Sequence, residues 1–171
     1  DLMAQETIYL AGGCFWGVEE LMRHKDGVLK TRVGYMGGHT ENPTYEQICT
    51  GKTGHAETME IVFDPTIITL RDILTVFFQI HDPTTQNQQG NDVGTQYRSA
   101  IFYTTKNQKV ICEKAVSDLN QSGLWPGKAT TTIEPAPTFW VAEDYHQNYL
   151  QSKPDGYNCH FPRPNWILPE T

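Results

Sequence analysis

The sequence predicts an α+β fold: a two-layer sandwich with a split β-α-β, ferredoxin-like core, a mixed but mainly antiparallel sheet, and helices packed on that sheet. Strand-like and helical periodicities alternate as β-α-β-β-α-β and then α-β-α. The 171 residues are enough for one domain with a sizeable core, so we expect a single domain over 1–171. Four prolines in 153–171 predict an irregular coil tail. A doubly wound parallel sheet is the alternative.

The first three elements are a strand, a helix and a second strand. Residues 7–13 are a β-rich run that ends in glycines. Apolar residues recur at helical spacing in 15–27, and Gly27 is expected to end that helix. Residues 28–38 form the second strand and end in a glycine pair.

The next strand and helix have the clearest patterns. Residues 55–65 alternate, which places these side chains on one face of a strand: Glu57, Met59, Ile61 and Phe63. A helix follows over 69–83, with Thr69 as its N-cap, Asp72 three residues later, and Pro83 at its end.

The second half of the chain contains shorter elements. Residues 88–96 are rich in glycine, asparagine and aspartate and predict a loop. A strand is expected over 97–104, a helix over 107–120, and a strand over 130–137 that Pro135 interrupts. The stretch 142–150 is expected to form a last helix or helical turn.

Composition narrows the classes of partner. The formal charge of −7 and the pI near 5.3 argue against nucleic acid or an anionic membrane as the main partner. Charges interrupt every apolar stretch before it is long enough to span a bilayer. We expect a cytoplasmic monomer. Because the chain begins at Asp1 and not at a methionine, export or organelle targeting stays open.

Cys14 is the first candidate for chemistry. In "AGGCFWGVEE" it follows a glycine pair and opens a helix, and a helix N-terminus lowers the pKa of a thiol. We therefore expect Cys14 to be a nucleophile that is ionised at rest, the alternative being a small packing residue. Phe15 and Trp16 are expected to be partly exposed and to form an aromatic wall for a small apolar group.

Four other side chains are candidates for the same site. Glu57 lies on the apolar face of its strand, where a carboxyl group should have a raised pKa and act as a proton donor, unless it lies at the rim in water. Tyr45, Asp92 and Tyr97 are weaker candidates, since tyrosines near strands are usually packing residues.

The four cysteines lie far apart and do not match a zinc-site spacing. Cys159 lies in the proline-rich tail, where a thiol is able to move to an oxidised partner and resolve it; the alternative is an incidental exposed thiol. Cys49 and Cys112 fall in helical segments and are interpreted as structural and inert.

Together these segments resemble the peptide-methionine (S)-S-oxide reductases of type A. The resemblance extends from about residue 6 to residue 161 and rests on seven motifs in order: GGCFWG, GYMGG, NPTYEQICTGKTGHAE, HDPT, QGNDVGTQYRSAIFY, AEDYHQNYL and GYNCHF. GCFWG alone is already specific to this family.

The resemblance implies roles in the reduction of methionine sulfoxide. Cys14 matches the cysteine that attacks the sulfoxide sulfur, and Glu57 the acid that protonates the oxygen. Phe15 and Trp16 match the aromatic residues that hold the methyl group.

It also implies further binding residues and a way to regenerate the thiol. Tyr45 and Tyr97 match hydroxyls that bind the oxygen, and Asp92 matches a carboxylate that positions the substrate backbone. Cys159 matches the recycling cysteine, and no second tail cysteine follows it. The expected product is a Cys14–Cys159 disulfide that thioredoxin, or a dithiol such as DTT, reduces, with no metal or organic cofactor.

Two other functions stay open at this point. The chain could be another thiol enzyme, a peroxidase or a cysteine–histidine hydrolase that uses Cys14 with His55 or His146. It could also be a non-catalytic redox sensor whose thiols form only a regulatory disulfide.

Overall fold

The structure, a computed structural model, describes residues 5–170. Its strands are β1 (Glu6–Gly12), β2 (Val28–Met36), β3 (Ala56–Phe63), β4 (Gln88–Gln89), β5 (Asp92–Val93), β6 (Ser99–Tyr103), β7 (Thr132–Pro135) and β8 (Trp140–Val141). Its α-helices are α1 (Phe15–Met22), α2 (Tyr45–Cys49), α3 (Leu70–Ile80), α4 (Lys106–Ser122) and α5 (Tyr149–Ser152), with 3₁₀ turns η2 (Thr95–Tyr97) and η3 (Asp144–His146).

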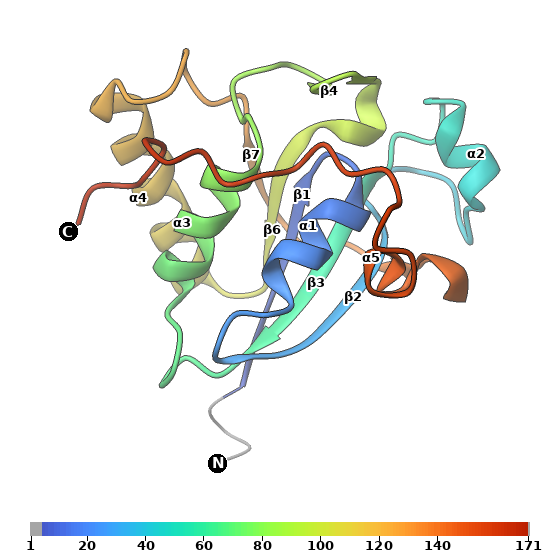
Figure 1. The fold of residues 1–171 in the computed structure, drawn as a ribbon, viewed down its shortest axis with the longest axis horizontal. Coiled ribbons are helices and arrows are strands. Elements are labelled where there is room, and N and C mark those ends of the chain that lie inside the picture. The colour runs from blue at the N-terminus through green and yellow to red at the C-terminus, as the bar shows by residue number, and fades with distance from the viewer. Residues whose placement is uncertain (1–4, 171) are drawn as a thin grey trace.

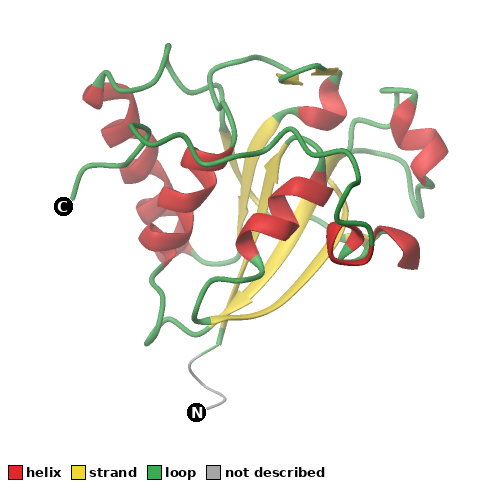
Figure 2. Cartoon of the chain, viewed as in Figure 1, coloured by secondary structure: helices red, strands yellow, loops and turns green. Residues whose placement is uncertain are grey.

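The main sheet confirms the split β-α-β core. Its six strands lie in the order β7-β6-β1-β3-β2-β8, and every pair is antiparallel except β6 with β7. Strands β1 and β2, which α1 connects, therefore run in the same direction with β3 inserted between them. Helices α1 and α3 lie across one face of the sheet (Figures 1 and 2). The doubly wound parallel alternative is wrong.

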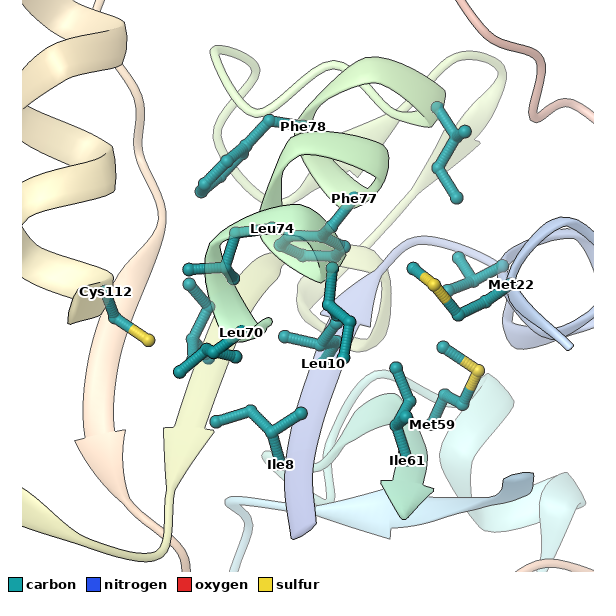
Figure 3. Close-up of a cluster of buried hydrophobic side chains, with 14 of the residues drawn as sticks. Ile8, Leu10, Met22, Met59, Ile61, Leu70, Leu74, Phe77, Phe78 and Cys112 are labelled. Carbon is teal, nitrogen blue, oxygen red and sulfur yellow. The ribbon is translucent and has the colours of Figure 1, made fainter. Parts of the chain in front are cut away.

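The core lies between the sheet and these helices. Strand alternation points Ile8 and Leu10 of β1 and Met59 and Ile61 of β3 to the helical side, where all four are fully buried. They meet side chains of α3 and α1 there, as Figure 3 shows: Leu70, Leu74, Phe77, Phe78 and Met22. The predicted apolar face of β3 is thus confirmed.

A smaller cluster covers part of the other face of the sheet. It contains Ala11, Met36, Ala56, Ala100 and Phe102, with Phe139 packed against it from the segment before β8. The cluster covers Ala56 at the start of β3, and Thr58 and Glu60 on the same face of this strand are buried as well.

Several local expectations need correction. The predicted loop 88–96 contains the short hairpin β4–β5. Tyr97 lies in the turn η2 and not in the strand, which begins at Ser99. Helix α1 ends at Met22, before the predicted stop at Gly27. The stretch 142–150 divides into η3 and α5, because Asn148 adopts a left-handed backbone conformation.

The tail has no regular structure after α5, as predicted, but it is tied down. It crosses α1 and α3 in Figure 1. The backbone N–H of Arg163 donates to the Gln79 carbonyl at 3.1 Å, and the Arg163 guanidinium donates to the Ile80 carbonyl at 2.7 Å. These bonds fix the tail along the C-terminal end of α3.

Within residues 5–170, every helix is too short or too polar to cross a membrane.

The predicted cap of α3 is present and gives a stability test. The Thr69 side chain accepts from the Asp72 N–H at 3.0 Å, and the Asp72 carboxylate accepts from the Thr69 N–H at 3.1 Å. Replacing Thr69 by alanine should lower the free energy of unfolding by about 1 kcal/mol, because one N–H at the helix start loses its acceptor. Urea unfolding measures the change. Ser117→Ala, an exposed position inside α4, is the control and should differ little from the parent chain.

Candidate active site

The pairing of β1 with β3 positions the thiol and the carboxyl group. The strands are antiparallel, so the end of β1 lies beside the start of β3. Cys14 follows β1 after one residue, Gly13, and is the N-cap residue of α1. The backbone N–H of Phe15, the first residue of α1, donates to Glu57 Oε1 at 3.2 Å. The structure thus brings together Cys14 and Glu57, which are 43 positions apart in the chain.

The turn before Cys14 needs glycine. Gly13 has φ +98°, a backbone conformation that other residues rarely adopt, and a Cβ there would lie 2.7 Å from the Gln89 side chain. Glycine at this position lets the hairpin β4–β5 lie against the start of α1.

The surroundings of Cys14 favour the protonated thiol. Its residue is only 8% exposed, and this burial raises the thiol pKa well above its ordinary value; Glu57, when it is ionised, raises it further. The backbone amide of Trp16 at the helix start acts in the opposite direction but has a smaller effect. Burial therefore opposes the predicted ionisation of Cys14 at rest, because loss of solvation has a larger effect than the helix N-terminus.

Glu57 behaves as predicted. It is 2% exposed, and burial raises its pKa to about 8, while the N–H of Phe15 lowers it by less. The carboxyl group is thus mostly neutral at pH 7, and the alternative of a carboxylate in water at the rim of the site is wrong. A neutral carboxyl group beside a thiol is able to donate a proton to a bound oxygen.

The two aromatic residues after Cys14 differ in exposure. Phe15 is 1% exposed and packs in the core against Tyr35, with ring centroids 5.8 Å apart, so the expectation that it is partly exposed is wrong. Trp16 is half-buried, as expected, and stacks on Tyr149 of α5 at 3.8 Å between centroids. The exposed part of the aromatic wall therefore comes mainly from Trp16.

His146 fixes the orientation of this wall. Its Nδ1 accepts a hydrogen bond from the Trp16 indole N–H at 3.0 Å, and its ring packs against Phe15 and Tyr45. Its Nε2 is buried without a hydrogen-bond partner in the described part of the chain. The chain pattern did not identify this role, although His146 lies between two tyrosines in the stretch 142–150.

The cysteine–histidine hydrolase alternative finds no support in these contacts. His55 uses both ring nitrogens to hold a loop: Nδ1 accepts from the Gly38 N–H at 2.9 Å, and Nε2 donates to the Thr40 carbonyl at 2.7 Å. His146 is engaged with Trp16. Among residues 5–170, neither histidine forms a hydrogen bond with Cys14 that would make it the base for this thiol.

Tyr45 lies at the first position of α2, and Glu143 holds it there. The Glu143 carboxylate accepts from the Tyr45 backbone N–H and from the Tyr35 hydroxyl, both at 2.8 Å. Burial raises the pKa of the Tyr45 hydroxyl, and the charge of Glu57 is the second cause, so the two side chains interact. Sequence reasoning missed Glu143, because its partners lie about 100 residues away.

Tyr97 and Asp92 approach the site from the hairpin and the turn that follows it. Burial is the largest cause that raises the pKa of the Tyr97 hydroxyl, and negative charge on Glu57 and Asp92 raises it further. Asp92 accepts from the Tyr157 hydroxyl at 3.1 Å and lies 3.8 Å from the Cys159 sulfur. The loop therefore carries predicted site residues, and it also contacts the tail.

The three remaining thiols have different environments. Cys159 is half-buried, and both Cys159 and Cys14 are free cysteines in this structure. Cys112 is fully buried in the core, as expected of a structural residue. Cys49 is exposed at the end of α2 and interacts with the Tyr45 side chain, so it is not the buried structural residue that was expected.

Within the described residues, the acidic, histidine and cysteine side chains nowhere gather in groups of three or more that could hold a metal ion.

Comparisons with known proteins agree with this geometry. The family model described as "Peptide methionine sulfoxide reductase" matches residues 6–165. A Streptomyces coelicolor protein named peptide methionine sulfoxide reductase MsrA is 58% identical over 169 residues, which cover 98% of this chain and 96% of that protein.

Solved structures are similar as well. Mxr1 from Saccharomyces cerevisiae in reduced form has a TM-score of 0.83 and 40% identity, covering 95% of this chain and 94% of Mxr1. Mxr1 in complex with Trx2 has a TM-score of 0.65 and 27% identity, covering 95% and 93%. The match spans nearly the whole chain, and the motifs that carry the resemblance surround one site: this chain belongs to the peptide methionine sulfoxide reductase family of oxidoreductases.

Proposed function

We propose that this chain reduces peptide-bound and free methionine (S)-sulfoxide to methionine, with Cys14 as the nucleophile and Glu57 as the acid. The observation that carries the assignment is the pair itself: a buried thiol at the start of α1 beside a buried carboxyl group that stays protonated to about pH 8. A sulfoxide oxygen is a poor leaving group until it is protonated, so the reaction needs both groups together.

In the first step, the Cys14 sulfur bonds to the oxidised sulfur while Glu57 gives its proton to the sulfoxide oxygen. The Glu57 carboxylate then takes the proton of the Cys14 thiol, so Glu57 is again a neutral carboxyl group. The hydroxyl group then moves from the methionine sulfur to the Cys14 sulfur as the new S–S bond breaks. Methionine leaves, Cys14 becomes a sulfenic acid, and the substrate gains the two electrons that the thiol loses. Because both groups are neutral at rest, no net charge enters the buried site before substrate binds.

The surrounding side chains position the substrate. Trp16, held by His146 and Tyr149, contacts the methyl group, with the buried Phe15 beneath the wall. The hydroxyls of Tyr45 and Tyr97 bind the sulfoxide oxygen. Asp92 positions the substrate backbone.

In the second step, Cys159 resolves the sulfenic acid. Its sulfur bonds to the Cys14 sulfur, the S–O bond breaks, and the hydroxyl group leaves as water with the proton of the Cys159 thiol. The redox disulfide is thus Cys14–Cys159, and a dithiol regenerates the enzyme by exchange.

We take this dithiol to be thioredoxin, which the solved complex of the similar protein Mxr1 with Trx2 supports. The cycle needs no metal or organic cofactor. A cytoplasmic location and a monomeric state stay predictions.

The first prediction separates the two cysteines. Cys14→Ser should release no methionine from a methionine sulfoxide peptide, because serine is a much weaker nucleophile. Cys159→Ser should release one methionine per chain without reductant and should then lose recycling by thioredoxin. Chromatography of the peptide and counting of free thiols measure both results. Cys112→Ser is the matched control and should turn over normally; a Cys14→Ser variant as active as the parent chain would refute the proposal.

The second prediction concerns the acid. Glu57→Gln should slow methionine release in a single turnover by about 100- to 10,000-fold, because the amide offers a hydrogen bond but no transferable proton. In the parent chain the same rate should fall as pH rises through about 8, where Glu57 loses its proton. Rapid quenching between pH 6 and 10 checks both. If the rate does not change with the substitution, Glu57 is not the acid.

The third prediction tests the burial of Glu57 without activity. The pKa of Glu57 is higher in the folded chain than in the unfolded chain. Glu57 therefore does not lower the free energy of unfolding below about pH 4.5, and lowers it by an increasing amount from there up to about pH 8. Glu57→Gln removes this cost, and its stability relative to the parent chain should increase by about 1.4 kcal/mol per pH unit within that range. Urea unfolding at several pH values measures the difference. The exposed Glu113→Gln should show no such trend.

A further inference from the structure

The tail residue next to Cys159 is bonded to the loop that carries Cys14. His160 is 4% exposed, and its ring Nε2 donates to the Gly12 carbonyl at 2.7 Å. Gly12 lies two positions before Cys14, and His160 one position after Cys159. A hydrogen bond thus joins the segment that carries Cys14 to the segment that carries Cys159, and these are the two residues that must form a disulfide.

The backbone around Cys159 is also fixed. The His160 N–H donates to Asn158 Oδ1 at 2.9 Å, which closes a tight turn with Cys159 at its centre. The Cys159 sulfur lies 3.8 Å from Asp92 Oδ2 and 3.8 Å from His160 Nδ1. The thiol is therefore held between the hairpin carboxylate and the neighbouring imidazole.

Helix α1 leaves room for this contact. A Cβ at Gly17 would overlap Asn158 Oδ1 and His160 Nδ1, and a Cβ at Gly13 would lie 3.2 Å from His160 Nε2. Two glycines of the GGCFWG motif thus face His160. Burial lowers the pKa of His160 to about 4, so the ring is neutral at pH 7, and donation by Nε2 leaves Nδ1 as the acceptor that faces the thiol.

The reaction requires such an anchor. The tail is irregular, and bringing a free coil to Cys14 would cost entropy in every cycle. A disulfide requires Cα atoms about 4.4–6.8 Å apart, and consecutive Cα atoms are about 3.8 Å apart. Fixing His160 to Gly12 keeps Cys159 close to the segment that carries Cys14, near enough that a charge on Cys159 raises the pKa of the Cys14 thiol.

We propose that His160 is a positioning residue for the second step: its hydrogen bond to the Gly12 carbonyl holds Cys159 where it attacks the Cys14 sulfenic acid. This role rests on the proposed function and concerns only the resolving step. The S–S bond forms as the S–O bond breaks and water leaves, and His160 donates no proton to the reacting atoms.

Two substitutions separate the hydrogen bond from packing. Glutamine at position 160 retains an N–H that can reach the Gly12 carbonyl, whereas leucine fills a similar volume without a donor. His24→Leu, at an exposed histidine after α1, is the matched control. Each 171-residue chain reacts with excess methionine sulfoxide peptide in the absence of reductant. Methionine release, trapping of the Cys14 sulfenic acid by dimedone, and the Cys14–Cys159 linkage by peptide mapping are followed over time.

We expect all variants to release one methionine at a rate within twofold of the parent chain. His160→Leu should form the disulfide about fivefold more slowly or worse, the factor expected for loss of one net hydrogen bond, and should accumulate trapped sulfenic acid. His160→Gln should form it nearly as fast as the parent chain.

Three results would overturn the inference: rapid disulfide formation in His160→Leu, equal slowing in both His160 variants, or loss of methionine release in both. The failure of the proposed function looks different. In that case the parent chain itself would release no methionine, whatever residue stands at position 160.

Discussion

The structure of this site depends on keeping two ionisable groups out of water in their neutral forms. Cys14 and Glu57 are both buried where the end of β1 meets the start of β3, and burial is the largest cause of each pKa shift. An ionised pair of these groups would repel in a poorly solvated place. The neutral pair is stable at rest, and it holds the proton that the sulfoxide oxygen needs.

Distant segments of the chain build and support this pair. Cys14, Glu57 and the aromatic wall come from the first 60 residues, but the wall is held by His146 and Tyr149. Glu143 holds the start of α2 on β2 through two hydrogen bonds. The irregular last third of the chain is therefore part of the site, and its hydrogen bonds compensate for its lack of secondary structure.

The antiparallel split core explains why these segments meet. With β3 between β1 and β2, the loops after β1 and β2 and the chain entering β3 lie at the same end of the sheet. The hairpin β4–β5 and the tail then approach that end, and Asp92 contacts Tyr157 and Cys159 there. The nucleophile, the acid and the resolving thiol therefore all lie at one end of the sheet.

The sequence by itself determined the features that depend on neighbouring residues. The alternation of β3 predicted its core face, and the Thr69–Asp72 spacing predicted the capping box of α3. The glycine pair before Cys14 predicted a thiol at a strand-to-helix junction, and Glu57 on an apolar face predicted a neutral acid. These are local properties of periodicity and backbone conformation.

Only the tertiary structure decided how much water reaches each group. The structure buried Cys14 and Phe15, exposed Cys49, and joined His160 to Gly12 by a hydrogen bond. Each outcome depends on segments that are distant in the chain, and their packing sets the solvation of the thiol. The spacing of residues within a motif does not predict how well a side chain is solvated. Solvation depends on which other segments cover the residue, and not on its neighbours in the chain.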